Sequence, residues 1–90
     1  MEVTFAPAAI ADLIHIRRYL GHFNPTAAKR TANRLAAVAL SLASFPERGR
    51  PRHDGARELT TIPPYVNVYD IAPGRVTILR VWHGAQRRDD

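Results

Sequence analysis

The stretch from Tyr65 to Arg88 constrains the fold most, because it is the segment richest in β-forming residues. Two apolar runs flank Ala72-Pro73-Gly74-Arg75, and a Pro-Gly pair between such runs predicts an antiparallel hairpin. If the turn closes around Pro73 and Gly74, directly opposed residues project to the same side of the sheet. The predicted pairs are then Ile71 with Val76, Tyr69 with Ile78, Val68 with Leu79, Asn67 with Arg80, Val66 with Val81 and Tyr65 with Trp82.

This register gives the hairpin two different faces. One face is aliphatic and must be covered by other parts of the chain, and it consists of Val66, Val68, Leu79 and Val81. The other face is amphipathic, so we expect it to stay half open and to contact another macromolecule. It carries Tyr65, Asn67, Tyr69, Arg80 and Trp82.

The segments before the hairpin are expected to cover its aliphatic face. Alternating residues predict a short strand over Glu2 to Phe5, and a 3.6-residue apolar period predicts a helix from Pro7 to Leu20. Asn24-Pro25 begins a second, alanine-rich helix that runs to about Ala43, and Arg57 to Ile62 is predicted as a further strand. The sequence therefore predicts an α+β fold of order βααβββ, with a helical hairpin on one face of a mostly antiparallel four-stranded sheet, in a single domain over residues 1–90.

Composition narrows the classes of molecule that this chain is expected to bind. The formal net charge is +5, and arginine supplies every basic residue except Lys29. Because arginine suits bidentate contacts with phosphate and carboxylate groups, we expect a nucleic acid or an acidic protein as partner; a GC-rich genome is the alternative explanation. The chain has no cysteine, no histidine at metal-ligand spacing and no apolar run of membrane-spanning length. We therefore expect no metal, no cofactor, no membrane contact and a cytoplasmic location.

Two basic clusters stand out. In the loop after Phe45-Pro46, Arg48, Arg50 and Arg52 alternate, so an extended backbone would project them the same way, toward a phosphate backbone or an acidic peptide. Solubility is an equally good reason for arginines in a loop. Lys29, Arg30 and Arg34 form a second cluster on the second helix, for which a solvated helix face is the simpler interpretation.

Several short motifs, in this order and over nearly the whole chain, resemble those of the RelE/ParE superfamily of toxins from bacterial type II toxin–antitoxin pairs. The motifs are Ala9-x-x-Asp12-Leu13, Asn24-Pro25, the loop from Phe45 to Pro51, Arg57-Glu58-Leu59, the strand from Tyr65 to Tyr69, and the segment from Ile78 to Ala85. The resemblance implies a toxin neutralised by a cognate antitoxin, which reaches operator DNA only through the antitoxin complex. RelE-like members cleave mRNA on the ribosome, whereas ParE-like members poison DNA gyrase.

The residues bear on this choice. Metal-independent RNA cleavage needs a base, an acid and cations around the phosphate, and the candidates are His83, Glu47, Arg80 and Arg57, with Arg48 and Arg50 as further cations. However, Val66 occupies a position where nuclease-like relatives often have arginine, and no tail tyrosine follows Trp82. We therefore favour the ParE-like function, keeping the ribosome-dependent nuclease and a toxin that has lost its toxicity as alternatives. The predicted contact residues are Arg48, Arg50, Arg52, Arg80, Trp82, Tyr65, Arg87 and Arg88.

Overall fold

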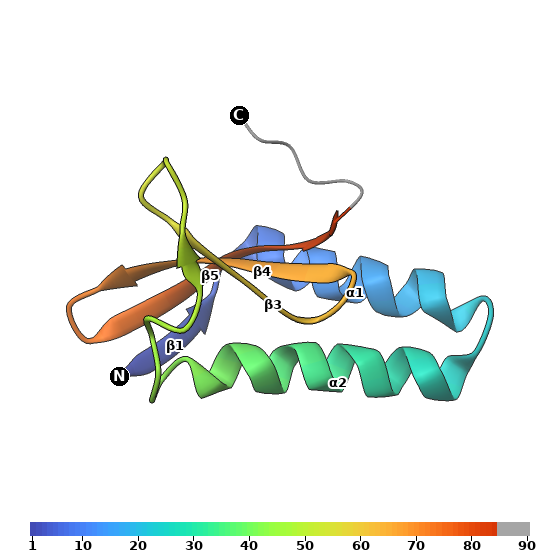
Figure 1. The fold of residues 1–90 in the computed structure, drawn as a ribbon. Helices are drawn as coiled ribbons and strands as arrows, with labels where there is room; N and C mark the ends of the chain where they lie inside the picture. The colour runs from blue at the N-terminus through green and yellow to red at the C-terminus, as the bar shows by residue number, and fades with distance from the viewer. Residues whose placement is uncertain (85–90) are drawn as a thin grey trace.

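The fold consists of two helices packed on one five-stranded sheet, as the computed structural model shows for residues 1–84 (Figure 1). In chain order the elements are β1 (Glu2–Phe5), α1 (Pro7–Gly21), α2 (Pro25–Ser41), β2 (Arg50–Pro51), β3 (Arg57–Ile62), β4 (Tyr65–Ala72) and β5 (Arg75–His83). The strand order across the sheet is β1-β5-β4-β3-β2. β1 runs parallel to β5, and the other neighbours are antiparallel. The predicted fold class is confirmed, although the short β2 makes the predicted four strands five.

The two helices begin where the sequence predicts. Pro7 and Pro25 lie in the first turns of α1 and α2, where a missing N–H group leaves no hydrogen bond unmade. Asn24 caps α2 because its side-chain oxygen accepts a hydrogen bond from the Ala27 N–H at 3.0 Å. Small buried residues, Ala28 and Ala39, let α2 pack closely against the rest of the molecule.

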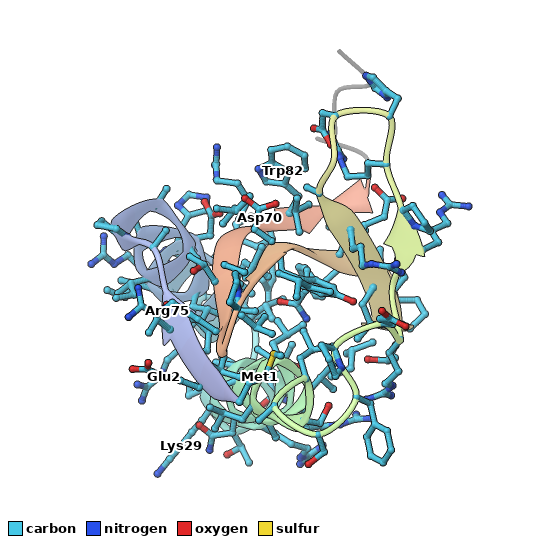
Figure 2. All side chains as sticks on the ribbon, turned by 90° about the vertical axis from the view of Figure 1, so that its left-hand side faces the viewer. Met1, Glu2, Lys29, Asp70, Arg75 and Trp82 are labelled. Atoms are coloured by element: carbon cyan, nitrogen blue, oxygen red, sulfur yellow. The ribbon has the colours of Figure 1, made fainter. Side chains whose placement is uncertain are left out.

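The helices cover a different face of the hairpin from the predicted one. The core beneath them contains Tyr65, Tyr69, Val76, Ile78 and Val81, together with helix residues such as Ile16, Leu35 and Leu42. On the opposite side of the sheet, Val66 and Val68 form a separate small cluster with Ala56, Leu79 and Trp82. Figure 2 shows Trp82 on the side of the sheet away from α2. The predicted orientation of Val66, Val68 and Leu79 toward the helices is therefore wrong, whereas that of Val81 is right.

A register shift in β5 explains why Val81 faces the helices while Arg80 and Trp82 do not. Val66 and Val68 face the open side for a different reason, because Tyr65 and Tyr69, which alternate with them along β4, pack beneath the helices. Ile71 pairs with Val76 and Tyr69 with Ile78, as predicted, but the pairing then slips by one residue at Leu79. Beyond the slip, Val68 faces Arg80, Asn67 faces Val81, Val66 faces Trp82 and Tyr65 faces His83. One extra residue in a strand is a β-bulge, and it exchanges the two faces for every later residue of that strand. The predicted pairing of Tyr65 with Trp82 fails for this reason.

Tyr69 is fully buried because its hydroxyl group finds partners inside the molecule. The hydroxyl donates a hydrogen bond to the Pro46 carbonyl oxygen at 2.7 Å and accepts one from the Gly49 N–H at 2.8 Å. Gly49 approaches so closely that a Cβ atom would lie 2.6 Å from the Tyr69 hydroxyl and 2.7 Å from the Glu58 carbonyl oxygen. The tyrosine thus ties the loop after α2 to the centre of β4.

Within residues 1–84, no helix combines the length and apolar character needed to cross a lipid bilayer.

Candidate functional site

The open face of the sheet carries an indole ring flanked by two guanidinium groups. The Cζ atoms of Arg80 and Arg52 lie 5.2 Å and 5.9 Å from the centre of the Trp82 ring, within the range of cation–π contacts. Trp82 also packs against the apolar cluster of Val66 and Val68 beneath it. Trp82 is therefore partly a packing residue and partly a surface one.

Asp12 of α1 fixes Arg80. The Arg80 Nε and Nη2 atoms donate to the two Asp12 carboxylate oxygens at 2.8 Å and 3.0 Å, and the Val81 N–H donates to the same carboxylate at 2.9 Å. These hydrogen bonds with Asp12 raise the pKa of Arg80 above its ordinary value, so the guanidinium group stays charged. Sequence analysis named Asp12 only as part of the Ala9-x-x-Asp12-Leu13 motif and gave it no partner. A usable signal was present, since Asp12 is the sole acidic residue between Pro7 and Ser41.

Arg50 and Arg52 form a network with two carboxylates. The Glu58 side chain, only 7% exposed, accepts from Arg50 Nη2 at 2.9 Å and from Arg52 Nη1 at 3.1 Å. Arg52 also donates to Asp54 through Nε and Nη2. This pairing with Asp54 is the largest influence that raises the pKa of Arg52 and lowers that of Asp54. Arg52 therefore uses its donors inside the molecule, and its pairing with Glu58 and Asp54 is a contact that sequence analysis missed.

The predicted row of three loop arginines does not form. The Arg48 Nη1 atom donates to the Ser41 hydroxyl on α2 at 2.7 Å, whereas Arg50 and Arg52 turn to Glu58 across the β2–β3 pair. The loop is extended only over the two residues of β2, so the alternation that would align the three side chains is too short. Arg50 and Arg52 therefore share Glu58 as a partner, whereas Arg48 binds elsewhere, to Ser41.

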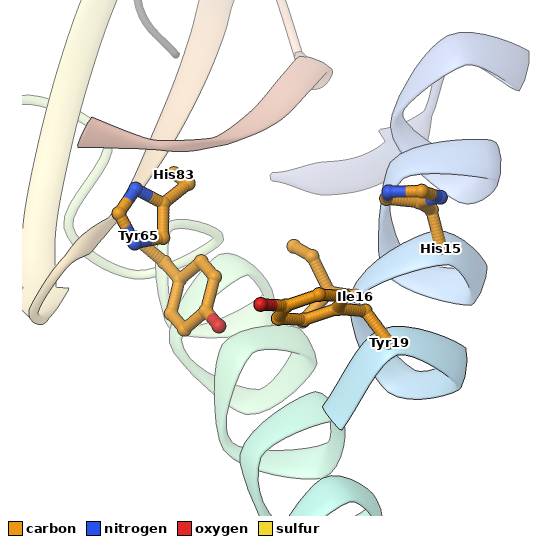
Figure 3. Close-up of a pocket in the computed structure, with 5 residues that line it drawn as sticks. All are labelled: His15, Ile16, Tyr19, Tyr65 and His83. Carbon is orange, nitrogen blue, oxygen red and sulfur yellow. The ribbon is translucent and has the colours of Figure 1, made fainter. Parts of the chain in front are cut away.

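Tyr65 and His83 lie on the helix-facing side of the sheet, at the end nearest the C-terminus of the described chain. Their rings meet edge to face, with centroids 5.6 Å apart and an interplanar angle of 88°. Together with His15, Ile16 and Tyr19 of α1 they line a pocket of about 310 Å³ (Figure 3). Burial raises the pKa of Tyr65, and the neighbouring Tyr19 adds to this effect. The phenol of Tyr65 is therefore a neutral group at physiological pH.

The four candidate catalytic residues lie in three different places. Arg80 lies on the open face with Val68, whereas His83 lies on the helix-facing side with Tyr65. Arg57 pairs with Tyr69. Tyr69 is four residues from Tyr65 along β4, so these two positions are about 13 Å apart at the usual rise per residue. The Arg57 guanidinium group donates to the backbone carbonyl oxygens of Gly49 and Glu47, at 2.7 Å and 3.4 Å. Only Arg57 and Glu47 are therefore brought together, and they meet through the backbone.

Two predicted contact residues, Arg87 and Arg88, lie outside the described residues. Within residues 1–84 there is no group of three or more histidine, aspartate or glutamate side chains that could hold a metal ion.

Comparison with known proteins identifies the family. Residues 3–88 match the model of the ParE toxin of the type II toxin–antitoxin system parDE. The chain is similar to Toxin RelE2 of Caulobacter vibrioides, with 48% identity over 85 residues, covering 94% of this chain and 97% of that protein. It is also similar to Toxin RelE3 of the same organism, with 34% identity over 90 residues, covering 97% and 98%.

Solved structures agree on the fold. The chromosomal ParDE system of P. aeruginosa superimposes with a TM-score of 0.82 at 22% identity, covering 92% of this chain and 95% of the other. The RelBE2 toxin–antitoxin complex of Mycobacterium tuberculosis gives a TM-score of 0.66 at 25% identity, covering 99% and 92%. The chain therefore belongs to the ParE toxin family within the RelE/ParE superfamily, and it is the toxin of a type II toxin–antitoxin module.

Proposed function

We propose that this toxin acts in the cytoplasm by binding and inhibiting DNA gyrase, and that it does not cleave mRNA. The observation that carries the proposal is the separation of the candidate catalytic groups. A general acid and a general base must both reach the same phosphodiester. His83 and Arg80 project from opposite faces of the sheet, and Arg57 donates to loop carbonyl groups. These side chains therefore do not converge on one scissile bond.

A ribosome-dependent mRNA endonuclease is the second candidate. It is favoured by the names of the relatives RelE2 and RelE3 and by the likeness to the RelBE2 complex. It is also favoured by the open face, where Trp82 could stack on an unpaired base while Arg80 stays charged beside it. For this candidate the reacting groups would have to come together on the ribosome.

Two parallel reactions test the choice. Purified toxin is mixed with gyrase and relaxed plasmid in one, and with ribosomes and mRNA in the other. We expect loss of supercoiling, intact mRNA, and unchanged gyrase inhibition by His83→Ala. Codon-positioned mRNA cuts that disappear in His83→Ala would reverse the choice. Growth that does not slow when the toxin is induced would instead favour a chain that has lost its toxicity.

We further propose that a cognate antitoxin neutralises the toxin by covering exposed apolar residues of the helices. Ile10 and Ile14 are about half exposed and lie four residues apart on one side of α1, and Leu40 is exposed on α2. Exposed apolar anchors on a chain of net charge +5 suit an amphipathic acidic segment, and the sheet edges β1 and β2 are available for strand addition.

Co-expression with the neighbouring gene tests the antitoxin. The two proteins should co-purify and stay together at high salt, because apolar anchors are insensitive to screening. Ile10→Asp with Ile14→Asp should release the antitoxin, whereas Asp70→Asn, exposed on the interior strand β4, should not. Recovery of the unmodified toxin alone at high salt would contradict a tight complex.

A further inference from the structure

A groove between the two helices carries positive charge that no carboxylate of residues 1–84 neutralises. Its volume is about 640 Å³, and it is lined by Arg17 of α1 and by Pro25, Thr26, Lys29, Arg30 and Asn33 of α2. Figure 2 shows Lys29 on the side of the molecule opposite Trp82. The groove is therefore distinct from the open face of the sheet.

The charge of the groove is free to act on a ligand. α1 and α2 carry five basic residues, namely Arg17, Arg18, Lys29, Arg30 and Arg34, and one acidic residue, Asp12. Asp12 is held by Arg80 of β5. Within residues 1–84, none of the five basic side chains forms an ion pair or a side-chain hydrogen bond. Arg50, Arg52 and Arg80 differ, because carboxylates bind each of them at 2.8–3.1 Å.

The lining favours a phosphate backbone over other anionic partners. The side chains that line the groove are cations, an amide, a hydroxyl group and one proline, so it lacks the large apolar anchors of protein interfaces. It also lacks the aromatic rings on which single-stranded bases stack. Tyr19 and Phe23 are exposed nearby with ring centroids 5.4 Å apart, but neither lines the groove. Tyr19 lies two residues beyond Arg17, about 200° around the helix, and it lines the pocket with Tyr65.

We propose that this groove binds the phosphate backbone of double-stranded DNA. The toxin would then contribute DNA contacts of its own, in addition to any that an antitoxin supplies. The inference does not depend on gyrase as the target, because DNA binding can be measured with the toxin and a duplex alone. A toxin that binds DNA without inhibiting gyrase is therefore distinguished from a toxin that inhibits gyrase without binding DNA.

The salt dependence of binding gives a quantitative test. Fluorescence anisotropy of a short labelled duplex is measured with the purified toxin over a series of salt concentrations. If the three cations of the groove each neutralise one phosphate, log K should fall with log salt with a slope of about −2.7, which is about 40-fold between roughly 50 and 200 mM salt. Lys29→Gln should reduce this change in affinity to about 12-fold. The triple variant with Arg17→Gln, Lys29→Gln and Arg30→Gln should lose the salt dependence.

Arg18→Gln is the matched control. Arg18 has the same charge and exposure as Arg17 but lies one residue further along α1, about 100° around the helix and outside the groove. The Arg18→Gln variant should show the same salt slope as the unmodified toxin. Lys29→Arg should also keep the slope, because it keeps the charge. Circular dichroism confirms that each variant is folded.

Three results would overturn the proposal. The first is an equal loss of slope in Arg18→Gln and Lys29→Gln, which would mean diffuse attraction with no site. The second is tighter binding of single-stranded RNA than of the duplex. The third is no binding of DNA at low salt by a toxin that does bind polyglutamate, which would make the occupant an acidic polypeptide.

Discussion

Replacing Tyr69 by phenylalanine should destabilise the toxin far more than the loss of one oxygen atom suggests. The aromatic ring keeps its packing, so no cavity forms, but two polar groups lose their partner. The Gly49 N–H, which donates to the hydroxyl at 2.8 Å, is buried, and the Pro46 carbonyl oxygen, at 2.7 Å, is partly buried. An unpaired buried polar group costs about 1–3 kcal/mol, so we expect a loss of about 2–3 kcal/mol in the free energy of unfolding.

This loss is measurable in a domain of this size. It is a large fraction of the roughly 5–15 kcal/mol that stabilises a typical domain, and it corresponds to a decrease in Tm of about 10–20 °C. Urea unfolding followed by circular dichroism gives the free energy. Hydrogen exchange gives a local readout, because the Gly49 amide should exchange faster once its acceptor is gone.

Tyr19→Phe is the control for this prediction. Tyr19 is exposed, and none of the hydrogen bonds within residues 1–84 uses its hydroxyl group, so its removal should change the unfolding free energy by less than about 0.5 kcal/mol. Equal, small effects of Tyr19→Phe and Tyr69→Phe would refute the argument that the buried hydroxyl holds the loop after α2 to the sheet.

Three further predictions follow from other contacts. Asp12→Asn should lower the unfolding free energy by about 1–3 kcal/mol in urea titrations, because Arg80 and the Val81 N–H lose a charged acceptor. Asn24→Ala should cost about 1 kcal/mol in the same assay, whereas Asn24→Ser should be nearly neutral, since serine also caps helices. Arg52 lowers the pKa of Asp54 below its ordinary 3.8, so the stability from this pair is present above that pH and is lost as the pH falls through the folded-state value. Unfolding measured at pH 5 and at pH 3 should therefore differ less in Asp54→Asn than in the unmodified toxin.

The elements and their order could be predicted from sequence because their signals are local. Pro7 and Asn24-Pro25 mark helix starts by their own chemistry, and Pro73-Gly74 marks the turn from which the first hairpin pairs follow. The bulge at Leu79 leaves no such signal. Ile78 and Leu79 are both apolar, so either residue could belong to the buried face, and alternation cannot show which one is extra.

The candidate site could be predicted less well, because it depends on long-range partners. Tyr69 was assigned to the open face because the predicted register placed it with Asn67 and Arg80. Its hydroxyl group binds a loop 20 to 23 residues away in sequence, so the side chain can be buried. Arg52 and Arg80 were identified as contact residues, but their carboxylate partners Glu58, Asp54 and Asp12 emerge only when strands and helix come together. A list of residue types identifies charged groups and leaves open which of them are already neutralised.

The parallel pairing of β1 with β5 has a consequence for the synthesis of the toxin. Glu2 lies beside Arg75, and Thr4 beside Thr77, 73 residues later in the chain. Because such a distant strand must be made before the first one can pair, β1 has no strand partner, and the five-stranded sheet cannot be completed, in any product that ends before β5. A growing chain therefore lacks Arg80, Trp82 and His83, and the surfaces they form, until β5 has been translated, and partial products that end before β5 should be harmless to the cell that makes them.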